Sequence, residues 1–473
     1  MGTVRRAVKN FLSLSLAQII SQAIYFVIIV YLARTLGAGN FGKISFAQAV
    51  VLYFMLIGDL GLSVLGVREV ARDRGQLESY ASGIVSLRLA LALFSFILLL
   101  GFTSLINKSA EIKYLIIFYG FSLFSSALLV EWLFQGIEKM EFIGISRIIN
   151  RLFFAALVFL FIKSSGQLLL IPYLWFGGAL AAAGFLFYIF SRQFGRIRLR
   201  FNLPLWKSLV RRALPMGAAF IMIQVYYNFD ILMLGFMKEE EVVGWYSAAY
   251  KLIFLVLAFI PIFINVIFPL MSKYYQESRE KLRTLISSST RLLTTIAFPL
   301  GIGGTLLARP IMGFLYGENF SPGIIGFQIL IWSVVIIYIR CTYEQSFLAC
   351  DQERRYLFGV ILGAATNIGL NIVLIPHFSL KGAAIATLTS ELVFSLYMFS
   401  YFQIVRKIKM MKYLLKPFIS ATFMGFVLYY FRNLSLFFSI SMGIIIYIIA
   451  ILLLKGVTFR ELIELRRQIM EKG

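Results

Sequence analysis

Residues 11–33 read FLSLSLAQIISQAIYFVIIVYLA, and this stretch decides the fold. About 20 apolar residues in an α-helix cross the ~30 Å hydrocarbon layer of a bilayer and satisfy all of their own backbone polar groups there. Basic residues precede the stretch at Arg5, Arg6 and Lys9, as in a signal peptide, but the apolar run is too long for one. We therefore expect it to remain as the first transmembrane helix.

Thirteen more stretches of the same kind follow, separated by short turns. The predicted spans are 11–33, 44–66, 80–106, 112–134, 142–162, 168–190, 214–236, 246–270, 288–315, 323–349, 356–375, 381–402, 413–431 and 435–454. Sixty per cent of the residues are hydrophobic and 14% are charged, a composition that a water-soluble domain of this size could not cover. We predict an all-α polytopic membrane protein with 14 transmembrane helices and no room for a soluble catalytic domain.

The basic residues predict the orientation of the chain. Most of the 45 Lys and Arg residues fall in the turns on the side of the N-terminus, and the segment 192–212 holds seven of them without an acidic residue. By the positive-inside rule, both termini are cytoplasmic, and the protein is a multi-pass protein of the inner cell membrane. The +23 charge is thus explained by anionic lipid, and no nucleic-acid partner is expected.

Cysteine and histidine do not indicate a catalytic or metal centre. Cys341 and Cys350 lie nine residues apart in one predicted helix, on opposite faces, so they cannot form a disulfide. The single histidine, His377, has no nucleophile or metal-ligand partner nearby in the sequence and is expected at the membrane interface. We therefore expect no cofactor, no metal and no enzymatic activity.

Matching motifs recur in the two halves of the chain. Residues 41–47 (FGKISFA) are similar to residues 243–249 (VGWYSAA), residues 86–89 (SLRL) are similar to 289–292 (STRL), and Glu131 with Phe134 matches Glu344 with Phe347. The order and the similar offsets favour a duplication of six helices, related by a pseudo-two-fold axis along the membrane normal. The predicted division is an N-terminal bundle (1–206), a C-terminal bundle (207–408), and two further helices with a cytoplasmic tail (409–473).

Several motifs resemble one known family. They are YLARTLGAGNFG (31–42), GDLGL (58–62), REVAR (68–72), EWLFQGIEKM (131–140), LYG (315–317), Asn367 to Pro376, and KGAAIAT (381–387). These motifs, spread over the first twelve spans, resemble the Wzx-type polysaccharide flippases of the MOP superfamily. The resemblance implies translocation of a polyprenyl-diphosphate-linked oligosaccharide to the outer leaflet, by alternating access to a cationic cavity between two bundles. It also implies the polysaccharide polymerase machinery as a candidate partner.

Charged side chains inside membrane helices are costly, so each one is a candidate site residue. The candidate ligands of the substrate diphosphate are Arg88, Arg147, Arg151, Arg291 and Arg340. Arg147 and Arg151 lie one helical turn apart and share a face. Arg147 and Arg291 also lie close enough to the end of a span for the side chain to reach the interface.

Other charged residues in the spans are candidate gate residues or counter-ions: Asp59, Glu131, Glu344, Asp230 and Lys251. Glu344 follows Arg340 by one turn, so a structural ion pair is an equal alternative to a ligand site there. Asp230 and Lys251 come from adjacent spans and are expected to pair. Glu391 stands alone near the middle of its span and is the candidate site for a coupling H⁺ or Na⁺, although the membrane potential alone could also drive export.

Proline and glycine mark candidate hinges at Pro261, Pro269 and Pro299, because proline removes a backbone hydrogen bond inside the bilayer. Packing kinks are an equal alternative. At the C-terminus, Thr458 and Glu461 form a capping-box pattern before an amphipathic segment that is expected to lie on the cytoplasmic surface.

Three rival functions remain. A lipid II flippase would share the architecture and the cationic cleft. A multidrug or cation antiporter of the same superfamily would need an acidic pocket, which Arg88, Arg147 and Arg151 oppose. A membrane glycosyl polymerase resembles proteins with a large outer loop, and no outer turn of this chain is long.

Overall fold

The computed structural model describes residues 3–401 and 410–456, and all regular elements in these ranges are helices. The first elements are α1 Thr3–Asp59, α2 Leu62–Arg72, η1 Arg74–Gln76, α3 Leu77–Leu105, α4 Ala110–Gly120, α5 Ser122–Leu128, α6 Glu131–Gly136, α7 Met140–Phe161, η2 Ser165–Leu170, α8 Ile171–Gln193 and α9 Leu203–Met237. The others are α10 Glu240–Leu257, α11 Phe259–Glu277, α12 Arg279–Leu306, α13 Ala308–Tyr316, η3 Glu318–Gly323, α14 Ile324–Ala349, α15 Glu353–Tyr401, α17 Met410–Tyr430 and α18 Leu436–Leu453. The predicted all-α fold class is confirmed.

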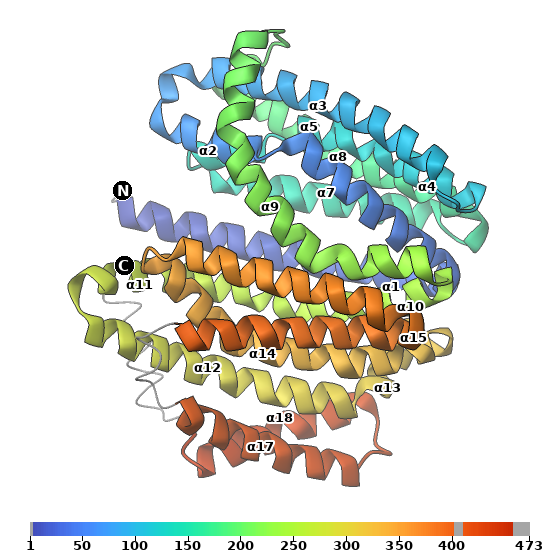
Figure 1. The fold of residues 1–473 in the computed structure, drawn as a ribbon, viewed down its shortest axis with the longest axis vertical. Helices are drawn as coiled ribbons and strands as arrows, with labels where there is room; N and C mark the ends of the chain where they lie inside the picture. Colours follow the sequence, from blue (N-terminus) through green and yellow to red (C-terminus); the bar gives the residue numbers. More distant parts are fainter. Residues whose placement is uncertain (1–2, 402–409, 457–473) are drawn as a thin grey trace. The chain divides into compact units, whose positions relative to one another are not determined.

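In the described ranges, ten helical segments are long and apolar enough to cross a membrane, or eleven if the bent helix α9 counts as one span. One of the ten, Leu14–Arg72, covers two predicted spans, and α1 is interrupted between them at Gly37, where φ is 76°. Figure 1 shows the chain turning back on itself within α1. Glu353–Tyr401 likewise covers two predicted spans, with a break at Ser379. The count of fourteen spans and the pseudo-two-fold axis remain predictions.

Two predicted spans are divided into shorter helices. The span predicted at 112–134 consists of α4, α5 and α6, and Leu129 and Val130 leave helical geometry between the last two. The span predicted at 246–270 is divided at Ala258, between α10 and α11, although Ala258 keeps helical φ and ψ angles (−60° and −19°) and Glu240–Glu277 forms one candidate span. Pro261 then lies in the first turn of α11, where a backbone N–H would lack a helical partner in any case. Pro269 and Pro299 lie inside α11 and α12, and hinge motion at any of the three remains a prediction.

The chain divides into two compact units, residues 1–244 and residues 245–473. Helix α9 belongs to the first unit because it packs against α1, α2 and α3. The predicted C-terminal bundle begins at residue 207, whereas the second compact unit begins at residue 245, so the observed boundary lies later in the chain than the predicted one. The predicted division into three parts concerns the proposed duplication of six helices and remains a prediction. It is a different division from that into two compact units.

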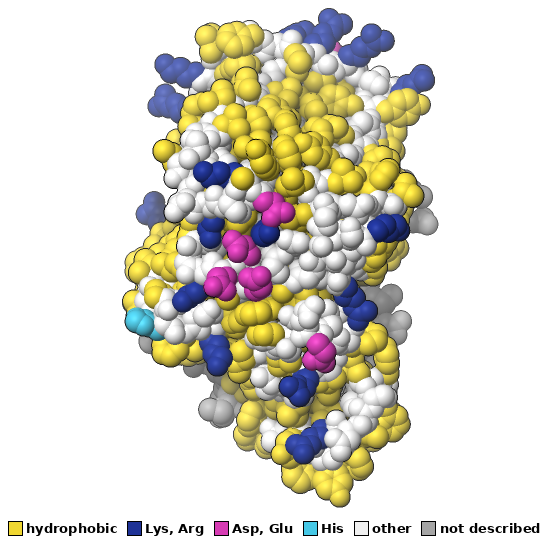
Figure 2. Space-filling view, turned by 90° about the vertical axis from the view of Figure 1, so that its right-hand side faces the viewer, with side chains coloured by type: hydrophobic (Ala, Val, Ile, Leu, Met, Phe, Trp, Pro, Cys, Tyr) yellow, Lys and Arg dark blue, Asp and Glu magenta, His cyan; other side chains and the backbone are white. Residues whose placement is uncertain are grey.

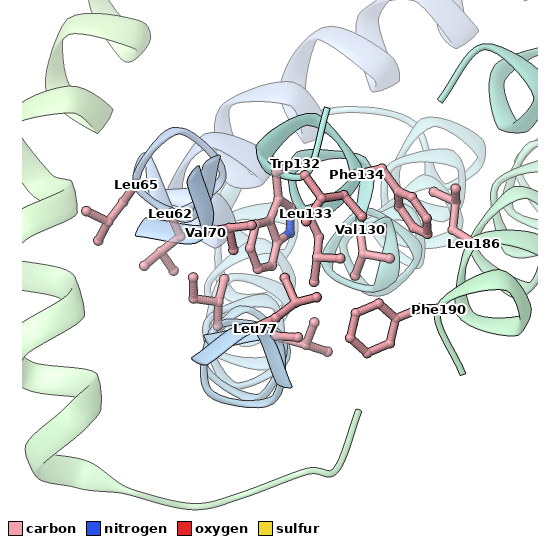
Figure 3. Close-up of a cluster of buried hydrophobic side chains, with 14 of the residues drawn as sticks. Leu62, Leu65, Val70, Leu77, Val130, Trp132, Leu133, Phe134, Leu186 and Phe190 are labelled. Atoms are coloured by element: carbon pink, nitrogen blue, oxygen red, sulfur yellow. The ribbon is translucent and has the colours of Figure 1, made fainter. Parts of the chain in front are cut away.

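A buried apolar cluster in the first unit holds the short helix α6 in place. Trp132, Leu133 and Phe134 of α6 pack with residues of α2, α3 and α8, including Leu62 and Phe190 (Figure 3). All five side chains are at least 97% buried. In a membrane such packing stabilises the fold through van der Waals contacts rather than through removal of apolar surface from water, and it fixes α6 against three neighbouring helices.

Hydrophobic side chains are also abundant on the surface, and charged side chains gather in groups between them (Figure 2). On α18, for example, Ile444, Ile445, Ile448 and Ile449 are each about half exposed. Such a surface is unfavourable in water and is typical of helices that face lipid. The expected cytoplasmic segment with Thr458 and Glu461 lies outside the described residues.

Candidate functional site

Arg88 is a buried charged residue of α3 whose contacts organise the break between α5 and α6. Its guanidinium donates to the backbone carbonyl of Ser126 at 2.8 Å and to that of Leu129 at 3.2 Å, and its Nε lies 3.1 Å from the Asp59 carboxylate. The side chain of Arg88 is only 6% exposed. The Ser126 carbonyl also accepts from the backbone N–H of Leu129 at 3.2 Å, and the Leu129 carbonyl lies where helical hydrogen bonding is interrupted, so Arg88 supplies an additional donor at the break.

A cavity of about 480 Å³ opens beside Arg88 in the first unit. Its lining combines charged, polar, aromatic and aliphatic side chains: Ser63, Val64, Val67, Arg68, Arg88, Ser126, Leu129, Glu131, Trp132 and Gln135. Arg88 and Glu131 were predicted as site residues, whereas Arg68, Trp132 and Gln135 were not. These three lie within the family-like motifs 68–72 and 131–140, which is the signal that could have found them.

Glu131 lies on the cavity wall and is held by Arg147 of α7. Arg147 Nη2 donates to the Glu131 carboxylate at 2.8 Å and its Nε lies 3.1 and 3.2 Å from the two carboxylate oxygens, while Nη1 donates to Gln18 at 2.9 Å. This two-point geometry is the strong form of the arginine–carboxylate pair. In this structure the predicted diphosphate ligand Arg147 and the predicted gate residue Glu131 neutralise each other.

Arg151 occupies a different environment from Arg147, although both lie on one side of α7. Its guanidinium lies 4.2 Å from the ring centre of Tyr25 in α1 and 5.2 Å from that of Trp175 in α8. A cation over an aromatic face is stabilised by the ring quadrupole without being neutralised. Arg151 therefore keeps its positive charge, which a phosphate group could use.

In the second unit, Arg340 of α14 lies between two glutamates. Nη1 donates to Glu344 at 2.9 Å, Nη2 donates to Glu391 of α15 at 2.8 Å, and the guanidinium lies 3.9 Å from the ring centre of Phe394. The Arg340–Glu344 ion pair, one of the two alternatives that the sequence left open, is present. The expectation that Glu391 stands alone is wrong, because packing of α14 on α15 brings Arg340 to it. Tyr356 also donates to Glu344 at 3.0 Å.

The remaining predicted site residues are dispersed. Arg291 of α12 donates to the backbone carbonyls of Gly456 at 2.6 Å and Lys455 at 3.3 Å, just after α18 ends. Asp230 of α9 is 2% exposed and belongs to the first unit, whereas Lys251 of α10 belongs to the second. Their pairing therefore remains a prediction. Cys341 and Cys350 are both free and buried, as expected.

The second unit also contains an apolar cavity of about 500 Å³ beside α12, α14, α17 and α18. Pro299 and Gly303 contribute from α12, Met424 from α17, and Gly443 and Ile444 from α18. Only three lining residues carry a side-chain hydroxyl: Thr295, Ser439 and Tyr447. This lining suits a hydrocarbon chain and gives no recognition of charge. The sequence analysis did not predict this cavity.

Comparison with known proteins identifies the family. Residues 7–275 match the model of the family described as "Polysaccharide biosynthesis protein". A protein of Escherichia coli (strain K12) with O-antigen transporter in its name is 25% identical over 374 residues, covering 76% of this chain and 88% of the relative. The Haloferax volcanii protein AglR, named as a flippase, is 31% identical over 171 residues, 35% of each chain.

Solved structures establish the fold. The lipid II flippase MurJ in an inward closed conformation superposes with a TM-score of 0.79 at 16% identity, covering 95% of this chain and 99% of MurJ. An inward-facing multidrug resistance MATE family transporter of the MOP superfamily gives 0.66 at 15% identity, covering 82% and 96%. The predicted membership is confirmed: the chain has the fold of the MOP superfamily and belongs to the polysaccharide biosynthesis protein family.

Proposed function

We propose that this chain is a flippase that moves a polyprenyl-diphosphate-linked oligosaccharide from the cytoplasmic to the outer leaflet of the inner membrane. The observation that carries the proposal is the cavity beside Arg88, which places charged and polar groups inside a unit built of membrane-spanning helices. Relatives named for O-antigen transport and for flipping support the same substrate class.

The substrate has three parts with different demands. A sugar head cannot enter hydrocarbon without losing its hydrogen bonds, so it needs a polar chamber. In the cavity beside Arg88, Ser63 and Gln135 offer hydroxyl and amide groups of the kind that bind sugars, while Trp132, which is only 3% exposed, forms part of the wall. The polyprenyl tail can stay in lipid and needs no polar partner.

The diphosphate needs cations that are not already neutralised. Arg88 and Arg147 are paired with Asp59 and Glu131, and Arg340 is paired with two glutamates. Arg151 contacts aromatic rings, and Arg68 lines the cavity with an exposed side chain. We therefore propose that Arg151 and Arg68 are the first residues to bind the phosphates. The other predicted ligands are Arg88, Arg147, Arg291 and Arg340, and each can bind phosphate only after it leaves its present partner.

We propose that the membrane potential contributes to export. Moving one charge outward is worth ~2.3 kcal/mol per 100 mV for an anion leaving a negative interior, so a diphosphate gains roughly twice that amount. An exchanged H⁺ or Na⁺ at Glu391 or Asp59 is the alternative drive. In proteoliposomes, collapsing the potential at constant pH and sodium gradients should slow flipping, and an unchanged rate would exclude the electrical drive.

A lipid II flippase is the second candidate, because MurJ shares this fold over nearly the whole chain. Complementation separates the two functions. The gene should restore surface polysaccharide in a strain that lacks an O-antigen-type flippase and should not restore growth of a strain depleted of its lipid II flippase. Rescue of the second strain alone would reverse the ranking.

A further inference from the structure

Residues 194–202, called here the basic strap, connect α8 to α9 and are attached to α3. The backbone N–H of Arg198 donates to Ser82 Oγ at 3.0 Å, and that of Arg200 donates to Ser86 Oγ at 2.9 Å. Four residues along a helix rise about 6 Å, and two residues of extended chain cover about the same distance. The two serines therefore hold the strap in an extended form along α3.

The side chains of the strap are basic and apolar in alternation, and most are exposed. Arg196, Arg198 and Arg200 are all exposed. Leu199 is 71% exposed and Phe201 is 76% exposed, whereas Ile197 packs against the buried apolar cluster of the first unit. In an extended chain, successive side chains point to opposite faces, so the arginines and the apolar side chains form two separate faces.

The three arginines of the strap form no salt bridge within the described part of the first unit. No salt bridge described there involves Arg196, Arg198 or Arg200, and the acidic side chain of Glu78 lies beside the backbone of Gly195. Farther along, Arg212 pairs with Glu69, while Lys207 and Arg211 of α9 are exposed. The strap thus presents a concentrated positive charge next to two large exposed apolar side chains.

The position of the strap indicates which part of the membrane this surface contacts. It lies between the end of one membrane-spanning helix and the start of the next, on the side that the basic residues predict to be cytoplasmic. That boundary offers phosphates of lipid headgroups to the arginines and acyl chains to Leu199 and Phe201. In water, the same two side chains would remain exposed at a cost.

We propose that the basic strap binds anionic phospholipid headgroups of the cytoplasmic leaflet, with Leu199 and Phe201 inserted at the acyl boundary. The partner is a bulk anionic lipid such as phosphatidylglycerol, not the transported substrate. This binding does not depend on the proposed flippase function, because lipid occupancy can be measured directly without a transport assay.

Lipid retention by the purified full-length protein tests whether the arginines of the strap bind anionic headgroups. Native mass spectrometry would count phosphatidylglycerol and phosphatidylcholine molecules retained from mixed micelles. The variant R196Q/R198Q/R200Q should retain phosphatidylglycerol at least about fivefold less well than the wild type. The control K108Q/K113Q/K163Q removes the same charge from two predicted outer turns and the outer end of the predicted span 112–134, and it should retain phosphatidylglycerol normally. Equal retention by both variants and the wild type, or equal loss in both, overturns the proposal.

Depth measurement tests the apolar part and needs no charge change. A bimane label on Leu199→Cys should be quenched by brominated phosphatidylglycerol in vesicles and shielded from aqueous iodide, and the native cysteines are buried and should not compete for label. Quenching by iodide alone overturns the insertion. Soluble pyrophosphate should displace little phosphatidylglycerol; full displacement would mean a site for free phosphate compounds and would also overturn the proposal.

Discussion

The guanidinium of Arg88 donates a 2.8 Å hydrogen bond to the backbone carbonyl of Ser126, close to the point where the fourth predicted span stops being helical. Arg88 thus supplies an additional donor at the helix break and carries a charge that Asp59 balances. This contact places a predicted ligand in a structural role beside the cavity. Its effect on transport should therefore come through the shape of the α5–α6 break.

Replacing Arg88 should destabilise the first unit. Arg88→Ala leaves Asp59 with only the Ser63 hydroxyl as donor and removes one donor each from the Ser126 and Leu129 carbonyls. Removing one partner of a buried pair costs about 3–5 kcal/mol, and the loss here should be smaller because the Asp59 side chain is 25% exposed. Arg88→Lys keeps the charge but cannot form the forked contact, so we expect an intermediate loss. Thermal unfolding of the detergent-purified variants measures both. An Arg88→Ala protein as stable as the wild type would refute the structural role.

Arg151→Ala should reduce export without reducing the amount of folded protein in the membrane. Its aromatic contacts contribute only about 0.5–2 kcal/mol, whereas loss of its charge removes the proposed phosphate ligand. Surface polysaccharide, normalised to membrane levels of the variant, is the measurement. Trp175→Leu is the matched control: it removes one ring contact and keeps the charge, so export should persist.

Truncation of Glu391 should lower the stability of the protein more than truncation of Glu344. Both accept hydrogen bonds from Arg340, but Glu391 is 2% exposed and Glu344 is 16% exposed, so solvent can replace only the second carboxylate. We expect Glu391→Ala to cost about 3 kcal/mol or more and Glu344→Ala clearly less. Thermal unfolding compares them. Equal losses would mean that burial does not set the strength of this network.

Gly42 and Gly244 occupy matching positions in the repeated motifs and are both packed against backbone. A Cβ on Gly42 would lie 1.8 Å from the carbonyl oxygen of Glu240, and one on Gly244 would lie 2.0 Å from that of Ala38. Either glycine-to-alanine change should destabilise the protein by about 1–3 kcal/mol. Gly184→Ala is the control, because nothing lies within 4 Å there, and it should be neutral or stabilising.

Cys350 should react slowly with maleimide at neutral pH. It follows α14 outside the membrane-spanning segment, and burial, assisted by Asp351, raises the pKa of its thiol to about 11. Since the thiolate is the reactive form, about 100-fold fewer thiolates are present at pH 8 than for an unperturbed cysteine. The labelling rate should rise steadily with pH towards 11. A rate that levels off near pH 9 would contradict this shift.

Much of the fold could be predicted because hydrophobic length and helix-breaking residues are local properties. The runs of apolar residues predicted the membrane spans, and a turn near Gly37 was expected because two full-length spans lie on either side of it. The break between Leu129 and Val130 could not be predicted in the same way, since neither residue is a glycine or proline. Arg88, which supplies an additional donor at the break, lies some forty residues earlier in the chain.

The sequence by itself determined that this chain is a helical membrane protein with charged residues buried in its spans, because the cost of exposing backbone and apolar side chains is set residue by residue. Only the tertiary structure decided which charges remain available. Arg340 meets Glu391 and Arg147 meets Glu131 through packing of separate helices, whereas Arg151 meets aromatic rings. The energy of a buried charge depends on the groups within a few ångströms of it, and those neighbours come from distant parts of the chain.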